Sequence, residues 1–149
     1  MELQQPSGFV IWLTGMKRAG KTTLATQLAQ RLTAAGLSAQ LLDEDGEARF
    51  FIEGLGAGKD DHAKVVKRFG YIARAVARAG GVAICAALSP YRDARDALRK
   101  EVRRFVEVFV DAPIETLQSR DGKDGLYRQA LASEIKGVAG VDLPYEPPT

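Results

Sequence analysis

Apolar positions along the chain alternate between short continuous runs and stretches with helical spacing. The continuous runs predict four strands, at residues 9–14, 39–43, 82–88 and 105–111. After the first run, Leu24, Leu28 and Leu32 recur at the period of a helix that begins at Lys21 and stops near Gly36. Further helices are predicted over residues 60–81, over residues 89–104 with Pro90 in the first turn, and after Pro113.

The order of these elements predicts the fold class. Strands that alternate with helices form a parallel sheet with helices on both faces, and ligands bind beyond the carboxyl ends of the strands. The 149 residues contain no repeat and no linker-like tract, and they are enough for one core. We expect one α/β domain over residues 1–149.

Composition narrows the function classes. A net charge of +2 is too mild for a nucleic-acid binder, which neutralises many phosphates at once. No apolar run approaches the roughly 18 residues that span a bilayer, and the N-terminus lacks a secretion signal. The single cysteine, Cys85, cannot form an internal disulfide. We expect a cytoplasmic protein without nucleic acid or membrane partners.

The stretch Gly15-x-x-x-x-Gly20-Lys21-Thr22 has the spacing of a phosphate-binding loop (P-loop). It follows a predicted strand and opens a predicted helix, the context that such a loop requires. Backbone N–H groups and the helix N-terminus can face phosphate oxygens, Lys21 can reach the terminal phosphates, and the Thr22 hydroxyl can ligate Mg²⁺. We expect ATP and Mg²⁺ as cofactors and nucleotide contacts from Gly15, Met16, Lys17, Arg18, Ala19, Gly20, Lys21, Thr22 and Thr23.

Other features favour a small-molecule kinase among P-loop proteins. The chain contains no asparagine, which excludes guanine selection through an Asn-Lys-x-Asp loop, and it is too small for an ATPase motor. Asp43 and Asp45 follow the second strand, where carboxylates can hold Mg²⁺ (Asp45) or accept a proton from the acceptor. If the strand continues through Asp45, the two aspartate side chains point to the same side of the sheet. The sequence Asp-x-Asp-Gly is, however, also typical of a turn. Residues 119–128, here called the lid segment, are basic and are expected to cover the transferring phosphoryl group.

The chain resembles one family, the adenylylsulfate kinases, which use ATP to phosphorylate the ribose 3′-hydroxyl of adenosine 5′-phosphosulfate (APS). Four stretches carry the resemblance in the family's order: LSPYRDARDALR, FVEVFVDAP, RDGKDGLYRQA and VDLPYEPP. The resemblance implies a P-loop NTPase fold of the nucleoside-monophosphate-kinase type. It also implies that Ser89, the family's site of serine phosphorylation, lies at the acceptor pocket, and that Arg120 and Lys123 belong to the nucleotide and lid region.

The residues and the resemblance together give a set of expected site residues. The catalytic group is expected to comprise Lys21, Asp43, Asp45, Ser89 and Lys123, and Arg120 joins the nucleotide contacts. An arginine fork suits a phosphosulfate group, so an anionic acceptor is expected. Its expected contacts are Arg49, Arg68, Ser89, Pro90, Tyr91 and Arg92.

On the acceptor side the chain departs from the family pattern. The family's Leu-Gly-Phe-Ser and Phe-Thr-Gly supply two phenylalanines that sandwich the adenine of the acceptor, and Ala57 and Val138 stand in their places. His62 and Val65 replace an expected arginine and asparagine, and one extra residue precedes Arg49. Base stacking contributes on the order of 1–3 kcal/mol per aromatic ring, so weak APS binding is predicted.

On the donor side the family's Gly-Leu-Ser-Gly-Ala-Gly-Lys becomes a loop that carries Met16, Lys17 and Arg18, and the lid segment gains Asp124. The motifs for ATP are otherwise complete. Three functions therefore remain open: an APS kinase, a kinase of the same fold for another anionic nucleotide or small alcohol, and a catalytically silent ATP-binding module. Because the family continues with another strand beyond the position of Thr149, a sheet edge covered in a homodimer is also considered.

Overall fold

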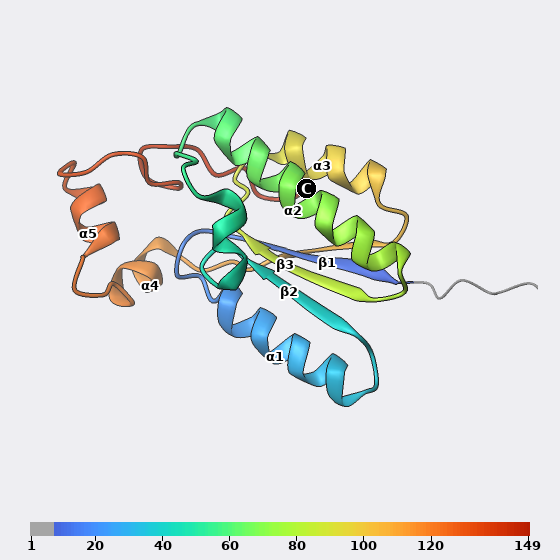
Figure 1. The fold of residues 1–149 in the computed structure, drawn as a ribbon. Helices are drawn as coiled ribbons and strands as arrows, with labels where there is room; N and C mark the ends of the chain where they lie inside the picture. Colours follow the sequence, from blue (N-terminus) through green and yellow to red (C-terminus); the bar gives the residue numbers. More distant parts are fainter. Residues whose placement is uncertain (1–7) are drawn as a thin grey trace, which may run out of the picture.

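Four parallel strands form the central sheet of the computed structural model, which describes residues 8–149 (Figure 1). The strand order is β2-β3-β1-β4, and β1 pairs with both β3 and β4. The strands are β1 (Phe9–Thr14), β2 (Ala39–Asp43), β3 (Val82–Ala87) and β4 (Phe105–Phe109). The predicted parallel α/β sheet is confirmed, with β3 and β4 ending one and two residues earlier than the apolar runs.

Helices cover both faces of this sheet. Figure 1 shows α1 (Lys21–Ala34) on one face, and α2 (Lys59–Arg78) with α3 (Arg92–Glu101) on the other. Two short helices, α4 (Ile114–Ser119) and α5 (Leu126–Leu131), lie beyond the carboxyl ends of the strands. Among the described residues, no helix is both long and apolar enough to cross a membrane.

Two local expectations about the helices are wrong. Between β2 and α2, where the apolar pattern predicts neither a strand nor a helix, the chain forms a 3₁₀ helix, η1 (Glu47–Ile52). Helix α3 starts at Arg92, so Pro90 precedes the helix and does not occupy its first turn. Ser89 has φ of 36° and Tyr91 is extended, so the backbone makes a sharp change of direction before the helix can begin.

The core explains why β3 reads as a continuous apolar run. All six of its residues are buried, because helices pack on both faces of this central strand. Trp12 and Phe69 lie in the cluster between the sheet and α2 and α3, whereas Leu13 lies in the cluster under α1. Each such large apolar side chain contributes about 1.5–3 kcal/mol by leaving water. The sheet is thus a rigid base for the loops at its carboxyl edge.

Residues 143–147, here called the C-terminal strap, cross the carboxyl ends of the strands. The hydroxyl of Tyr145 lies 2.8 Å from Oγ1 of Thr14, the last residue of β1. Arg95 is fully buried and donates from Nη2 to the carbonyl of Glu146, and the Glu146 N–H donates to the carbonyl of Pro90. The strap therefore ties the ends of β1 and β3 to α3.

Candidate functional site

The loop between β1 and α1 has glycines where no other residue fits. A Cβ on Gly15 would lie 2.5 Å from the carbonyl oxygen of Val110, and Gly20 has φ of 113°, in the left-handed region. Gly20 is also the N-cap of α1, so no side chain occupies the first N–H groups of the helix. The loop thus offers backbone N–H groups and a helix N-terminus to an anion.

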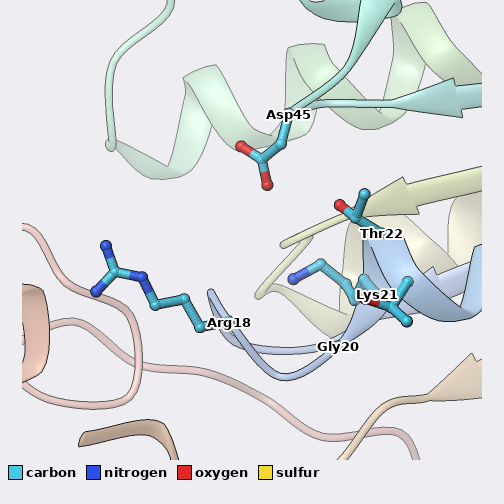
Figure 2. Close-up of a pocket in the computed structure, with 6 residues that line it drawn as sticks. Arg18, Gly20, Lys21, Thr22 and Asp45 are labelled. Atoms are coloured by element: carbon cyan, nitrogen blue, oxygen red, sulfur yellow. The ribbon is translucent and has the colours of Figure 1, made fainter. Parts of the chain in front are cut away.

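A cavity of about 250 Å³ opens over this loop, lined by Arg18, Gly20, Lys21, Thr22, Thr23 and Asp45. Figure 2 shows the Lys21 and Thr22 side chains on one side of the cavity and the Asp45 carboxylate across from them. The Lys21 ammonium donates to the carbonyls of Gly15 and Met16, at 2.7 and 3.0 Å. Burial lowers the pKa of Lys21, while the carboxylates of Glu44, Asp45 and Asp43 act in the opposite direction.

The two aspartates at the end of β2 and just after it differ in burial. The strand ends at Asp43, and the backbone N–H of Asp45 donates to Oδ1 of Asp43 at 2.9 Å in a turn. Because the strand does not continue through Asp45, the two side chains are not expected to point to the same side of the sheet. Asp43 is 3% exposed, and its Oδ2 is buried with no hydrogen-bond partner among the described residues. Asp45 is exposed and lines the cavity. Only Asp45 can therefore contact a ligand there directly.

Sequence reasoning missed Glu44, which stands between the two aspartates. Its Oε1 accepts the backbone N–H of Leu88 at 2.7 Å, which fastens the end of β2 to the residue after β3. Burial raises the pKa of Glu44 to about 7, although Lys21 and the Leu88 N–H favour the ionised form. A carboxyl with a raised pKa beside the phosphate loop is a candidate functional group. In the sequence Glu44 is one acidic residue among three in a turn-like stretch, and nothing in that pattern indicates that its side chain is buried.

The lid segment lies against the phosphate loop. Arg18 Nη1 pairs with Asp121 Oδ1 at 2.9 Å, and Arg18 Nη2 pairs with Asp124 Oδ2 at 2.6 Å. Arg120 Nη1 donates to the carbonyls of Arg18 and Ala19, at 3.2 and 3.3 Å. The hydrogen bond from Arg18 lowers the pKa of Asp124. Arg120 thus lies at the phosphate loop, while Lys123 is exposed on the lid segment.

A second cavity, of about 210 Å³, lies on the other side of the lid segment. It is lined by Lys17, Leu88, Leu126, Tyr127, Ile135, Lys136, Gly137, Val138 and Ala139. A Cβ on Gly137 would lie 3.7 Å from the Cβ of Ala57, so the two segments that the family pattern equips with phenylalanines are neighbours. The cavity has mainly aliphatic walls, with Tyr127 as its aromatic residue. Tyr127 and Lys136 were not among the expected site residues.

Ser89 is enclosed near the site and is 2% exposed. Its Oγ accepts the indole N–H of Trp12 at 3.0 Å and lies 2.9 Å from Thr14 Oγ1. Tyr145 of the C-terminal strap lies on the other side of Thr14. In this conformation the Ser89 hydroxyl belongs to a buried network, and Pro90 beside it is also buried.

The other residues expected to hold an anionic acceptor do not converge on one point. Arg68 Nη1 donates to the carbonyl of Phe51, and Arg92 donates from Nε and Nη2 to the carbonyl of Pro147. Arg49 is exposed on η1. Tyr91 lies with the Lys59 ammonium 5.1 Å from its ring centre, away from the first cavity. These arginines hold backbone carbonyls or face solvent.

The donor set of the first cavity fits Mg²⁺ carried by a nucleotide. No group of three or more His, Cys, Asp or Glu side chains within residues 8–149 could hold a metal alone. Magnesium commonly uses one or two protein oxygens together with phosphates and water. The Thr22 hydroxyl and the Asp45 carboxylate, which face each other across the cavity, are oxygen ligands of that kind.

Comparison with known proteins gives consistent matches. The family model described as adenylylsulphate kinase matches residues 7–149. An adenylyl-sulfate kinase of Picosynechococcus is 44% identical over 142 residues, which cover 95% of this chain and 80% of that protein. One from Rippkaea orientalis is 45% identical over 141 residues, covering 95% and 77%. The structure of the Mycobacterium tuberculosis APS kinase in complex with AMPPNP and APS has a TM-score of 0.86 at 34% identity, covering 96% of this chain and 84% of that one.

Proposed function

Because the chain belongs to the adenylylsulphate kinase family of ATP-dependent phosphotransferases, we propose that it transfers the γ-phosphoryl group of ATP to the ribose 3′-hydroxyl of APS. The observation that carries this proposal is the first cavity. It brings together the N-terminus of α1, the Lys21 ammonium, the Thr22 hydroxyl and the Asp45 carboxylate. This is the set of groups that phosphoryl transfer needs for positioning and charge neutralisation.

Each group has a defined task in this proposal. The loop N–H groups and Lys21 bind the β- and γ-phosphates and stabilise the negative charge of the transition state. The Asp45 carboxylate faces the first cavity, where it can take the proton of the attacking hydroxyl. Mg²⁺, when bound with the nucleotide near Thr22 and Asp45, supplies further neutralisation of phosphate charge. Arg120 and Lys123 of the lid segment add positive charge from above the loop.

The second cavity is the proposed place for the adenosine of the acceptor. Lys17 lines this cavity and its neighbour Arg18 lines the first one, so both cavities border the phosphate loop. The walls lack the aromatic faces that would hold a purine ring from both sides, and Arg68 and Arg92 are engaged with backbone carbonyls. These observations favour a second candidate, a kinase of the same chemistry for a different anionic alcohol.

The decisive experiment measures ADP release from ATP and Mg²⁺ with a panel of acceptors that includes APS, other adenine nucleotides and phosphorylated alcohols. The Lys21→Ala variant, measured in parallel, corrects for contaminating activities. Turnover that needs APS supports the proposal, and turnover that needs another acceptor supports the second candidate. Saturable ATP binding with no turnover on any acceptor would mean that the chain is an ATP-binding module.

A homodimer in the cytoplasm is proposed as the working state. In the described sheet, β2 and β4 each have one unpaired edge, and Phe50 and Phe51 next to β2 are 61% and 40% exposed. Covering these groups in a second subunit would remove apolar surface from water. Size-exclusion chromatography with light scattering tests this proposal, and a monomer at micromolar concentration contradicts it.

A further inference from the structure

The phosphate loop and the lid segment meet through one arginine fork. Arg18 stands at the tip of the loop, and its two terminal nitrogens pair with different carboxylates of the lid segment, at 2.9 Å for Asp121 and 2.6 Å for Asp124. The nitrogen that pairs with Asp124 also contacts the second oxygen of that carboxylate, at 2.8 Å. The Arg18 side chain is 29% exposed, and those of Asp121 and Asp124 are 10% and 61% exposed, so water screens the pair with Asp124 more strongly than the pair with Asp121.

One partner of Arg18, Asp121, is itself held in place. The carboxylate of Asp121 accepts the backbone N–H groups of Tyr127 and Arg128, at 3.1 and 2.9 Å, and so holds the start of α5. The Tyr127 hydroxyl donates to the carbonyl of Lys17 at 2.5 Å. A carboxylate that already holds a helix end presents its other lone pairs to Arg18 without further loss of side-chain freedom.

The backbone of Arg18 adds an independent observation. Its φ is 67°, in the left-handed region that glycine adopts most easily, and a side chain there costs free energy. Arg18 also lines the first cavity, but Figure 2 shows its guanidinium directed away from Lys21. The side chain is therefore placed to hold the lid segment while its backbone shapes the phosphate site.

We propose that Arg18 is a positioning residue that fastens the lid segment to the phosphate loop through Asp121 and Asp124. Opening of the lid segment breaks two charge-assisted contacts, and closure restores them next to the bound phosphates. The catalytic consequence rests on the proposed ATP-dependent function, whereas the structural consequence does not. Loss of the fork should raise KM for ATP about fivefold to tenfold and change kcat much less, because Arg18 does not point at the reacting atoms.

The test uses the full chain and five variants. Arg18→Gly removes the fork and suits the positive φ, so it should not unfold the protein. Arg18→Lys keeps the charge without the fork. Asp124→Asn removes one carboxylate, alone and together with Arg18→Gly. Arg31→Ala, an exposed position in the last turn of α1, is the matched control for the loss of one arginine.

Two measurements are made on each protein. Hydrogen exchange of the amides of residues 121–128 reports opening of the lid segment without ATP or any acceptor. KM for ATP at low and high salt reports the coupling to the nucleotide.

We expect the amides of residues 121–128 to exchange faster in Arg18→Gly than in the wild type. Arg18→Lys should have an exchange rate between these two. In the Arg18→Gly background Asp124→Asn should have no further effect, and KM should depend less on salt than it does in the wild type. Arg31→Ala should match the wild type. Unchanged exchange in Arg18→Gly, or equal effects of Asp124→Asn in both backgrounds, overturns the proposal. A protein without kinase activity still gives the exchange result, so failure of the proposed function is distinguishable from failure of this inference.

Discussion

Asp43 and Asp45 offer the sharpest experiment on the site, because one turn gives them opposite environments. We predict that Asp45→Asn lowers kcat while thermal stability and ATP affinity stay close to wild type. Asp43→Ala should lower stability, whereas Asp43→Asn should keep most of the stability and activity. The reason is that Asn retains the Oδ1 acceptor for the Asp45 N–H, whereas Ala removes it.

The magnitudes follow from burial and hydrogen bonding. A hydrogen bond to a charged group contributes about 1.5–3 kcal/mol, and Asp43 is 3% exposed, so Asp43→Ala should lose an amount in this range. Oδ2 of Asp43 is buried without a hydrogen-bond partner, which costs free energy in the wild type. Because Asp43→Ala also removes this oxygen, the loss of stability should lie toward the lower end of the range. At roughly 2–4 °C per kcal/mol for a chain of this size, Tm falls by about 3–12 °C. The exposed Asp45 should change stability by no more than about 0.5 kcal/mol.

The kinetic arm separates catalysis from folding. Loss of a general base or of a metal-binding carboxylate costs about 10²–10⁴-fold in rate, so kcat of Asp45→Asn should fall by that factor. Differential scanning fluorimetry gives Tm, and a coupled ADP assay gives kcat. The reasoning is refuted if Asp45→Asn turns over normally, or if Asp43→Asn loses as much activity as Asp45→Asn at unchanged Tm.

Three further predictions concern the remaining groups. ATP with Mg²⁺ should stabilise the folded wild type by about 2.7 kcal/mol at a hundredfold excess over Kd, and Lys21→Ala should abolish the resulting rise in Tm; an equal rise in both proteins contradicts this. Ala57→Phe combined with Val138→Phe should tighten APS binding in calorimetric titrations, and tight saturable binding by the wild type would show that the aliphatic walls suffice. In the nucleotide- and metal-free protein, Glu44 keeps a proton up to about pH 7 that its unfolded form releases near pH 4.5. Wild-type stability should therefore fall by up to about 3 kcal/mol relative to Glu44→Gln as pH rises through this window, which chemical denaturation at several pH values measures.

The fold was largely predictable because its signals are local. Continuous apolar runs identify β1 to β4, and the glycine spacing after β1 identifies the phosphate loop whose Gly15 has no room for a Cβ. The first cavity follows from these two features alone, since the end of β2 lies beside the loop in a parallel sheet. Lys21, Thr22 and Asp45 line this cavity together.

The rest depends on tertiary contacts that sequence spacing does not encode. Arg92 and Arg68 look like anion ligands in sequence, yet their guanidinium groups hold carbonyls of residues 55 and 17 positions away. Burial raises the pKa of Glu44, and this burial arises in the tertiary fold, where the carboxyl lies against the N–H of Leu88 after another strand. Arg18 and Asp124 each look like an isolated departure from the family pattern. Their pairing appears only when the lid segment folds over the loop.

The C-terminal strap has a consequence for the order in which the protein acquires its binding site during synthesis. Tyr145 reaches Thr14 across 131 positions of sequence, whereas β1, β3 and β4 can pair once residue 109 is available. Contacts of such long sequence separation form late, because the chain between them must be ordered first. The residues that precede the phosphate loop therefore gain their last support only after residue 145 has left the ribosome. A released chain truncated after residue 130 should hold the sheet but bind nucleotide poorly.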